Sequence, residues 1–201
     1  MIDFTPRRFS ALAQFLTTKL NSLSDTPIDQ AEISQKLQNY GCHCFQEMND
    51  LVRGQGPPVD ELDNLCKKLF KCHQCVNKID YPGEGCEFTS SYKYQQVPEL
   101  FCEPVGTNTA CQKEQCECDL KFAEELAELW VGDDWEFNNF YWKQRKNVKK
   151  NPTFDKEAVC YQSGSAEETD KCCGQPGSRV PYNSDLRECC TDGKLRGFGA
   201  C

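Results

Sequence analysis

Hydrophobic residues recur at steps of three and four along three stretches of this chain, which is the pattern of one face of an α-helix. The first stretch contains Phe9, Leu12, Ala13, Leu16, Leu20 and Leu23. The second contains Leu62, Cys66, Leu69, His73 and Val76. The third, within roughly 114–131, contains Cys118, Phe122, Leu126 and Leu129. The sequence therefore predicts three amphipathic helices that pack on a common core.

Proline and glycine mark where the predicted elements begin and end. The pair Pro57–Pro58, followed by an acidic turn, predicts the start of the second long helix. A short helix is expected to begin at Thr26–Pro27 and to end before Gly41. The turn-rich stretch 80–85 precedes 90–96, whose residues predict a short strand.

Sixteen of the 201 residues are cysteine, a proportion far above that of cytosolic proteins. Their even number and dense spacing predict a disulfide framework formed in an oxidising compartment. Zinc binding is a weaker alternative, because the chain has only two histidines and the pairs Cys72–Cys75 and Cys116–Cys118 fall on predicted helices. We therefore expect a secreted, extracellular protein without a metal site.

The formal net charge of −8 narrows the range of partners. An acidic chain is repelled by nucleic acid and by anionic membranes, although it can attract calcium weakly and without a defined site. No apolar run reaches the ~20 residues of a transmembrane segment. The first residues, MIDFTPRR, lack the apolar core of a signal peptide, so we expect a mature chain or a fragment that carries a starting methionine.

Two cysteine-containing motifs follow one another in a distinctive order. YGCHCF at 40–45 precedes PVDELDNLCKKLFKCHQC at 58–75, and CQKEQCECDLKFA lies at 111–123. Together they resemble the secreted phospholipases A2, whose hallmark is YGCYCG followed by PVDxLDxCCxxHDxCY. The resemblance spans roughly Phe9 to Cys160. It implies a mainly α, disulfide-rich domain over 1–161, with two long antiparallel helices cross-linked by disulfides, an N-terminal helix and a small β-wing.

The same resemblance places two substitutions at the catalytic centre of the family. The family's catalytic histidine falls on Leu69, and its calcium-binding aspartate falls on Phe70. The residues after Cys44 also lack the glycine-rich turn that aims carbonyl oxygens at calcium, and Glu47 and Asp50 do not replace that cradle. We therefore expect no catalytic residues, no calcium site of the family type and no cofactor.

His73 and Asp119 match family positions that belong to a hydrogen-bond network around the catalytic histidine. The family network also contains a tyrosine, and the resemblance places Tyr92 or Tyr94 at its position. We interpret His73, Asp119 and Tyr92 as a remnant of this network that is kept for structure. An alternative is that His73 has taken over as general base. That role is disfavoured, because one helical turn displaces the imidazole by about 6 Å, and no oxyanion stabiliser remains.

The family framework implies most of the disulfide map. Carried over position by position, it pairs Cys42–Cys160, Cys44–Cys66, Cys72–Cys118, Cys86–Cys111 and Cys102–Cys116. A further family bridge falls on Leu65 and Glu125, so both of its halves are absent together. Cys75 then has no partner within the domain, and we expect it to bond to one of Cys172, Cys173, Cys189, Cys190 and Cys201. The choice stays open, because six cysteines can pair in many ways.

The composition changes after residue 161. A polar linker, QSGSAEETDK, is followed by two cysteine pairs separated by turns. This 162–201 segment resembles the double-cysteine repeats of galaxin-like matrix proteins and predicts a cysteine-rich extension. About forty residues cannot build a sufficient core, so its stability must come from disulfides. The preceding 130–154 is aromatic and basic, which suits either a solvated face or an interaction surface.

These inferences favour a non-catalytic extracellular protein that acts as a structural or interaction module in a matrix, coat or mineralised layer. Its partner is expected to be an extracellular protein, a matrix component or another copy of the chain. Two alternatives stay open: a toxin- or ligand-like protein that binds a receptor or membrane surface, and a residual lipid hydrolase. Merged basic and aromatic patches on one face would favour the receptor or membrane alternative.

Overall fold

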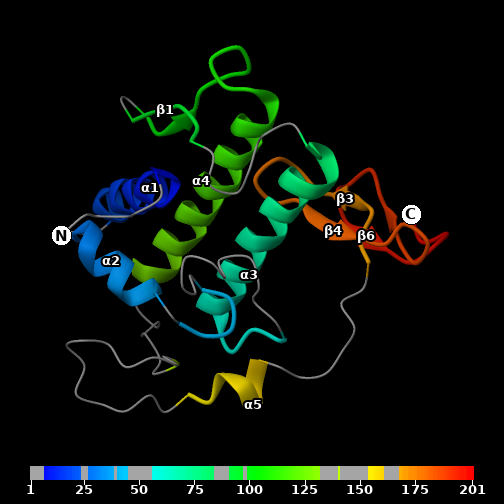
Figure 1. Ribbon diagram of the computed structural model, residues 1–201, viewed down its shortest axis with the longest axis horizontal. Coiled ribbons are helices and arrows are strands. Elements are labelled where there is room, and N and C mark those ends of the chain that lie inside the picture. Colours follow the sequence, from blue (N-terminus) through cyan, green and yellow to red (C-terminus); the bar gives the residue numbers. More distant parts are fainter. Residues whose placement is uncertain are drawn as a thin grey trace.

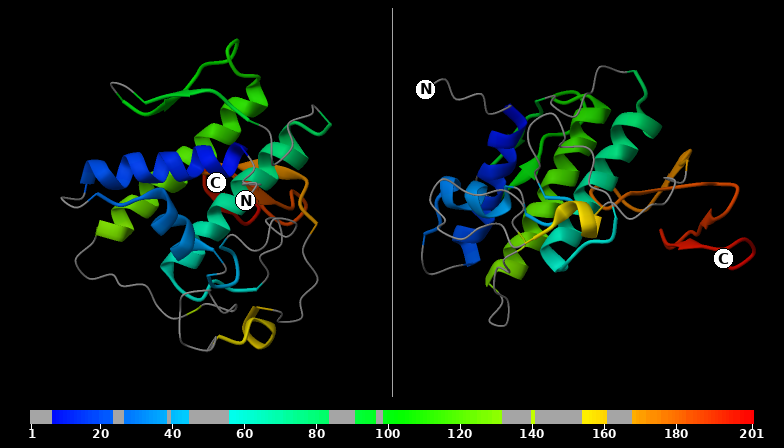
Figure 2. Two further views of the ribbon diagram at one scale, coloured as in Figure 1. Left: turned by 60° about the vertical axis from the view of Figure 1, so that its left-hand side comes forward. Right: turned by 60° about the horizontal axis from the view of Figure 1, so that its bottom comes forward.

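Two long helices form the centre of the protein. A computed structural model describes residues 7–23, 27–38, 40–44, 56–83, 91–96, 99–131, 140, 154–160 and 168–201. In Figure 1, α3 (Glu61–Gln74) and α4 (Ala110–Val131) lie side by side and run in opposite directions. Figure 2 shows that α1 (Arg7–Leu23) and the C-terminal strands lie on opposite sides of this helix pair. The predicted fold class, mainly α and disulfide-rich, is confirmed.

The N-terminal helix α1 packs along α4 through the predicted apolar stripe. The stripe ends in an exposed leucine, Leu23, at the last residue of the helix. Burying large aliphatic side chains contributes roughly 1.5–3 kcal/mol for each one, so this contact supplies a large part of the core. Among the side chains that the structure describes in this helix, at 11–23, the buried ones are Leu12, Ala13, Phe15, Leu16 and Leu20.

The short second helix, α2 (Gln30–Leu37), begins later than the sequence pattern indicated. The Asp29 side chain accepts a hydrogen bond from the N–H of Glu32 at 2.7 Å and thereby caps the helix. The predicted start at Thr26–Pro27 is therefore wrong. A carboxylate that can pair with a free N–H is a stronger start signal here than a proline.

Helix α3 begins where Asp60 accepts a hydrogen bond from the N–H of Asp63 at 2.9 Å. This cap satisfies one of the free N–H groups of the first turn. Beyond Gln74 the helix continues as a π-helical segment, η1 (Cys75–Asp80), which the periodicity did not predict. The buried face of α3 consists of Leu62, Asp63, Leu65, Cys66, Leu69, Cys72 and His73.

Helix α4 is preceded by a reciprocal cap. The N–H of Gln112 donates to the Thr109 hydroxyl at 3.1 Å, and the N–H of Thr109 donates to the Gln112 side chain at 2.9 Å. The helix consequently starts at Ala110, four residues before the predicted position. A disulfide between Cys72 and Cys118 fixes α4 against α3.

The predicted wing forms as two short antiparallel strands, β1 (Tyr94–Gln95) and β2 (Phe101–Cys102). Asn108, which is only 3% exposed, holds the base of the wing. Its amide accepts from the N–H of Lys93 and donates to the carbonyls of Lys93 and Glu103, at 2.7, 2.8 and 3.0 Å. One side chain therefore replaces part of the ladder that such short strands cannot supply.

The C-terminal segment folds as two small antiparallel hairpins. Their strands are β3 (Lys171–Cys173) with β4 (Val180–Tyr182), and β5 (Glu188–Cys189) with β6 (Leu195–Arg196). Disulfides join Cys173 to Cys189 and Cys190 to Cys201. Two-stranded hairpins are marginally stable alone, so the disulfides are the main internal restraint of this segment. None of the helices in the described ranges is long and apolar enough to cross a membrane.

Candidate functional site

A buried polar cluster, the inner cluster, consists of His73 on α3, Asp119 on α4 and Tyr92 just before β1. His73 Nε2 lies 2.7 Å from Asp119 Oδ1, and the Tyr92 hydroxyl donates to Asp119 Oδ2 at 2.6 Å. The side chains of His73 and Asp119 are 0% exposed, and Tyr92 is 8% exposed. The structure thus brings the three residues of the expected network together.

The choice between Tyr92 and Tyr94 is decided by the direction in which each side chain points. The Tyr94 hydroxyl donates to Gln14 on α1 rather than to Asp119. The two tyrosine rings contact each other, with centroids 6.2 Å apart, and both lie beside Phe15, whose ring centroid is 4.6 Å from that of Tyr94 and 5.9 Å from that of Tyr92. Burial raises the pKa of Tyr94. Tyr92 is therefore the tyrosine of the inner cluster.

The surroundings of the inner cluster restrict what it can do chemically. Leu69, one turn before His73 on the same helix, is 6% exposed, and Phe70 is partly buried. A fully shielded carboxylate must have hydrogen-bond partners, because burying it without them costs several kcal/mol. His73 and Tyr92 supply those partners. The arrangement holds three elements together and shields the imidazole from solvent.

A second buried carboxylate, Asp63, organises the loop before α3. Its oxygens accept from the N–H groups of Cys42, His43 and Val59 at 2.9, 2.7 and 3.0 Å. Gly41 adopts φ +56, and a Cβ placed there would lie 2.4 Å from the Asp63 carboxyl carbon. Glycine is therefore required at 41 both by conformation and by space. The sequence motif includes Asp63, but the pattern did not indicate this role.

The described residues do not fit a calcium ion of the kind held by the family that the sequence motif resembles. Calcium takes six to eight oxygen ligands, whereas Phe70 offers none and the Asp63 oxygens are engaged by backbone N–H groups. In the part of the chain that the structure describes, no three His, Cys, Asp or Glu side chains are grouped to hold a metal. Glu47 and Asp50 lie outside that part, so the expectation for their loop stays a prediction.

The disulfides link the loop, the helices and the wing. The structure joins Cys44 to Cys66, Cys72 to Cys118 and Cys102 to Cys116, the same pairs that the sequence resemblance implies. Cys42 bonds to Cys160 at the end of the short helix α5 (Lys156–Cys160), which confirms a fourth pair that the resemblance implies. Cys86 lies outside the described residues, so its pairing with Cys111 stays a prediction.

Comparison with known proteins identifies the origin of this framework. The profile of the family described as Phospholipase A2 matches residues 18–139, which is more than half of the chain. The chain belongs to the phospholipase A2 family. A phospholipase A2 of Ovis aries is 29% identical over 139 residues, which cover 66% of this chain and 95% of that protein.

Other relatives in the phospholipase A2 family cover about half of the chain. "Phospholipase A2 homolog otoconin-22" of Xenopus laevis is 33% identical over 103 residues, which cover 51% of this chain and 72% of that protein. "Basic phospholipase A2 1" of Naja melanoleuca is 34% identical over 97 residues, which cover 47% and 71% respectively. Two of these relatives are thus named as phospholipases A2, whereas otoconin-22 is named as a homologue.

The C-terminal hairpins lie beyond the segment that matches the phospholipase A2 family. A disulfide between Cys75 and Cys172 attaches them to the end of α3, and Gln74 donates to the Thr169 hydroxyl at 3.3 Å beside it. The sequence predicted that Cys75 bonds to a C-terminal cysteine, and the structure selects Cys172. Gly177 (φ +83) rests on α4, where an added Cβ would lie 2.8 Å from the Glu117 carbonyl oxygen. We call residues 168–201 the tail.

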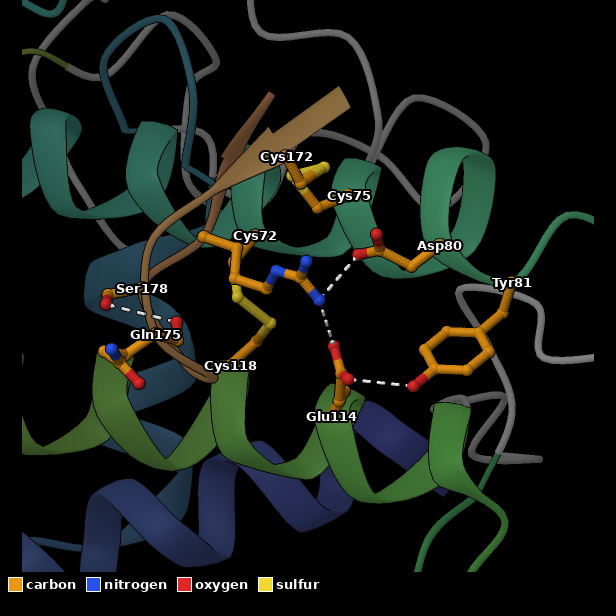
Figure 3. Close-up of polar contacts among 10 residues, drawn as sticks. Cys72, Cys75, Asp80, Tyr81, Glu114, Cys118, Cys172, Gln175 and Ser178 are labelled. Carbon is orange, nitrogen blue, oxygen red and sulfur yellow. Dashed lines mark hydrogen bonds and ion pairs between the residues drawn. A yellow bond between two sulfur atoms is a disulfide. The ribbon is translucent and has the colours of Figure 1, made fainter. Parts of the chain in front are cut away.

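A second polar cluster, the outer cluster, consists of Asp80, Tyr81, Glu114 and Arg179, and it joins the tail to the end of η1 and to α4. Figure 3 labels Asp80, Tyr81 and Glu114 of this cluster. The Arg179 guanidinium on the tail lies 2.9 Å from Asp80 Oδ2 and 3.0 Å from Glu114 Oε2. The Tyr81 hydroxyl donates to Glu114 Oε1 at 2.8 Å. The three charged side chains are about one-fifth exposed: 22% for Arg179 and 19% for each of Asp80 and Glu114.

The surroundings of the outer cluster raise the pKa of two of its members, Asp80 and Tyr81. Burial raises the pKa of Asp80, and Glu114 adds to this effect while Arg179 opposes it. Burial, followed by the hydrogen bond to Glu114 and its charge, raises the pKa of Tyr81 to about 12. Sequence reasoning missed Asp80, Glu114 and Arg179, because an ion pair between distant segments leaves no local pattern.

Proposed function

We propose that this chain is a secreted, non-catalytic member of the phospholipase A2 family that acts as an extracellular structural or interaction module. The observation that carries the proposal is the pair Leu69–Phe70, which stands where the family motif has its catalytic histidine and calcium-binding aspartate. An aliphatic side chain cannot remove a proton from water, and a phenyl ring cannot bind calcium. The chain thus lacks both parts of the family's hydrolytic machinery.

The burial of His73 supports the same conclusion. A general base must come within hydrogen-bonding reach of the proton that it removes. His73 is 0% exposed and is bound to Asp119, which also accepts from Tyr92. Without a cation or another group to stabilise an oxyanion, a displaced base would also lack what is usually the largest catalytic term. The inner cluster is therefore proposed to be structural.

The cysteine content and the tail support an extracellular location and a role in assembly. Disulfides form and persist in oxidising environments, and the described part of the chain carries them in the helices, the wing and the tail. We propose that residues 1–161 form the family domain and that 162–201 form a galaxin-like extension. The partner is proposed to be an extracellular protein, a matrix component or a second copy of the chain.

The absence of catalysis is tested by measuring lipid hydrolysis. The purified chain is incubated with mixed phospholipid micelles and millimolar calcium, with the Leu69→Ala variant as control and the sheep relative as a positive reference. We expect fatty-acid release by the chain to equal that of Leu69→Ala. Calcium-dependent release above that control would contradict the proposal and would favour the residual lipid hydrolase.

The proposed role in assembly is tested by capture from native extracellular material. The intact chain and the Arg179→Met variant are immobilised, and bound proteins are identified by mass spectrometry. We expect the intact chain to retain a matrix protein or another copy of itself. Retention of an integral membrane receptor instead would support the toxin- or ligand-like alternative.

A further inference from the structure

His43 is a buried histidine between two disulfide-bonded cysteines, ahead of α3. Cys42 bonds to Cys160 on α5, and Cys44 bonds to Cys66 on α3. The His43 side chain is only 8% exposed. Histidine is the residue whose ordinary pKa places its change of charge between about pH 5 and pH 8. A shielded imidazole at this position therefore makes the surrounding segment a candidate for pH dependence.

The imidazole of His43 shares one carbonyl oxygen with a lysine. His43 Nε2 lies 3.1 Å from the Gly56 oxygen, and Lys67 Nζ donates to the same oxygen at 2.9 Å. A carbonyl oxygen only accepts hydrogen bonds, so His43 Nε2 carries a proton and donates it. We call His43, Gly56 and Lys67 the loop latch, because these residues join the segments 40–44 and 56–60 to α3.

The other ring nitrogen determines how the loop latch responds to a proton. Within the part of the chain that the structure describes, His43 Nδ1 is shielded from solvent and has no hydrogen-bond partner. In the neutral ring this nitrogen is only an acceptor, whereas in the charged ring it becomes a second donor. A buried donor without an acceptor is unfavourable. The geometry around Nδ1 therefore favours the neutral imidazole.

The charges around the imidazole act mainly in the same direction. A charged His43 and the Lys67 ammonium would be two cations bound to one oxygen, and cations at so short a separation repel each other. Burial lowers the pKa of His43; Asp63 and the Gly56 hydrogen bond oppose this effect, and the charges of Lys67 and Lys71 add to it. The Asp63 oxygens are already engaged by backbone N–H groups. Within the described ranges, all the charged groups that act on the ring belong to α3.

We propose that the loop latch is an acid-sensitive switch, in which neutral His43 holds Gly56 against α3 and protonation of His43 releases it. The folded chain takes up the proton at lower pH than an unfolded chain, whose histidine has the ordinary pKa of 6.5. The contribution of the latch to stability is therefore complete well above pH 6.5 and is lost as the pH falls below that value. The inference goes beyond the proposed function and does not depend on the loss of catalysis.

The protonation of His43 is measured directly by NMR titration of the imidazole rings. The chain has only two histidines, His43 and His73. Either His43→Gln or His73→Gln removes one set of ring resonances and thereby assigns the other. We expect the His43 ring of the parent chain to titrate below its ordinary pKa of 6.5. This measurement does not depend on both variants being folded, because one of them is enough for the assignment.

Amide hydrogen exchange locates the consequence of protonation. Between about pH 8 and about pH 5, the protection factors of the Cys42, His43 and Val59 N–H groups should fall severalfold in the parent chain, while those in α4 stay unchanged. His43→Gln keeps an amide donor for Gly56 but cannot be protonated, so its protection factors should stay the same. His73→Gln makes the same substitution at the other histidine and should keep the parent's pH response.

Two outcomes would overturn the proposal. One is a His43 ring that titrates at or above its ordinary pKa in the parent chain, because protonation would then not oppose the folded structure. The other is a fall in protection that His43→Gln shows to the same extent as the parent chain, because this would assign the acid response to groups other than His43. Circular dichroism spectra and the protection of α4 establish that the variants are folded before they are compared.

Discussion

The inner and outer clusters bridge the same two helical segments but differ in what they can accomplish. The inner cluster places a fully shielded carboxylate between an imidazole and a phenol. The outer cluster places a guanidinium from the tail between two carboxylates that are about one-fifth exposed. The inner cluster lies inside the segment that matches the phospholipase A2 family. The outer cluster includes Arg179, which lies beyond that segment.

The difference shows how one pair of helices can hold its interior and its tail by different means. Inside, hydrogen bonds that are shielded from water keep the helices in one arrangement, and removing one partner leaves a buried polar group unsatisfied. Near the surface, water weakens each ion pair, so attachment of the tail needs several contacts together. The tail accordingly uses the Cys75–Cys172 disulfide, Gly177 against α4 and Arg179.

The largest effect is expected from breaking the inner cluster. His73→Leu keeps the volume but removes a hydrogen-bond donor from Asp119, and we expect it to lower the free energy of unfolding by about 1–3 kcal/mol. Urea denaturation with the disulfides intact measures this change. His73→Gln retains a donor on the same helix face and should cost less. Equal stability of His73→Leu and the parent chain would show that the hydrogen bond does not stabilise the fold.

An intermediate effect is expected from breaking the outer cluster. Arg179→Met leaves Asp80 and Glu114 without their shared cation, and we expect a loss of about 1–2 kcal/mol, between the ranges for exposed and buried pairs. The loss should be local, with faster amide hydrogen exchange in β3 and β4 but not in α1. Lys194→Met, an exposed substitution in the same tail, is the matched control. Uniformly faster exchange across the chain would contradict a local attachment.

The smallest expected effect is the contribution of Tyr81 to the pH dependence of stability. Its pKa of about 12 exceeds the ordinary value of 10, so its contribution to stability is complete below pH 10 and is lost as the pH rises through about 12. Stopped-flow ultraviolet titration should show a tyrosine ionising near pH 12. The Tyr81→Phe variant assigns this step.

Substitution of the hydrogen-bond acceptor sharpens this measurement. Glu114→Gln removes the negative charge beside Tyr81, so the pKa of Tyr81 should fall toward 10 while burial keeps it above that value. A Tyr81 that titrates at the ordinary value in the parent chain would show that the outer cluster does not form in solution.

Periodicity and cysteine spacing predicted the parts of the fold that repeat a family pattern. The helix faces that contain Leu69, His73 and Phe122 are buried as expected, because an apolar stripe has few alternatives to packing on the core. The resemblance also placed Asp119 and His73 within one network. Helix starts were less predictable. The capping pair Thr109–Gln112 starts α4 four residues before the position that the apolar stripe predicted.

The remaining features depend on contacts between distant segments. The choice of Cys172 as the partner of Cys75 requires knowing where the tail lies, which no spacing rule supplies. The same is true of Arg179, whose carboxylate partners are far from it in the sequence. The role of Asp63 was hidden for another reason, because its partners are backbone N–H groups that every residue type except proline provides.

The bond between Cys75 and Cys172 also has a consequence for how the chain acquires its disulfides during synthesis. The two cysteines are 97 residues apart, and a ribosome that adds roughly 5–20 residues per second needs on the order of 5–20 seconds to reach the second one. Throughout that interval Cys75 has no native partner and, as a thiol, can attack neighbouring disulfides. Any bond that Cys75 forms in this way has to be exchanged after Cys172 emerges. A chain truncated before Cys172 holds an odd number of cysteines and keeps a thiol that can react with another molecule.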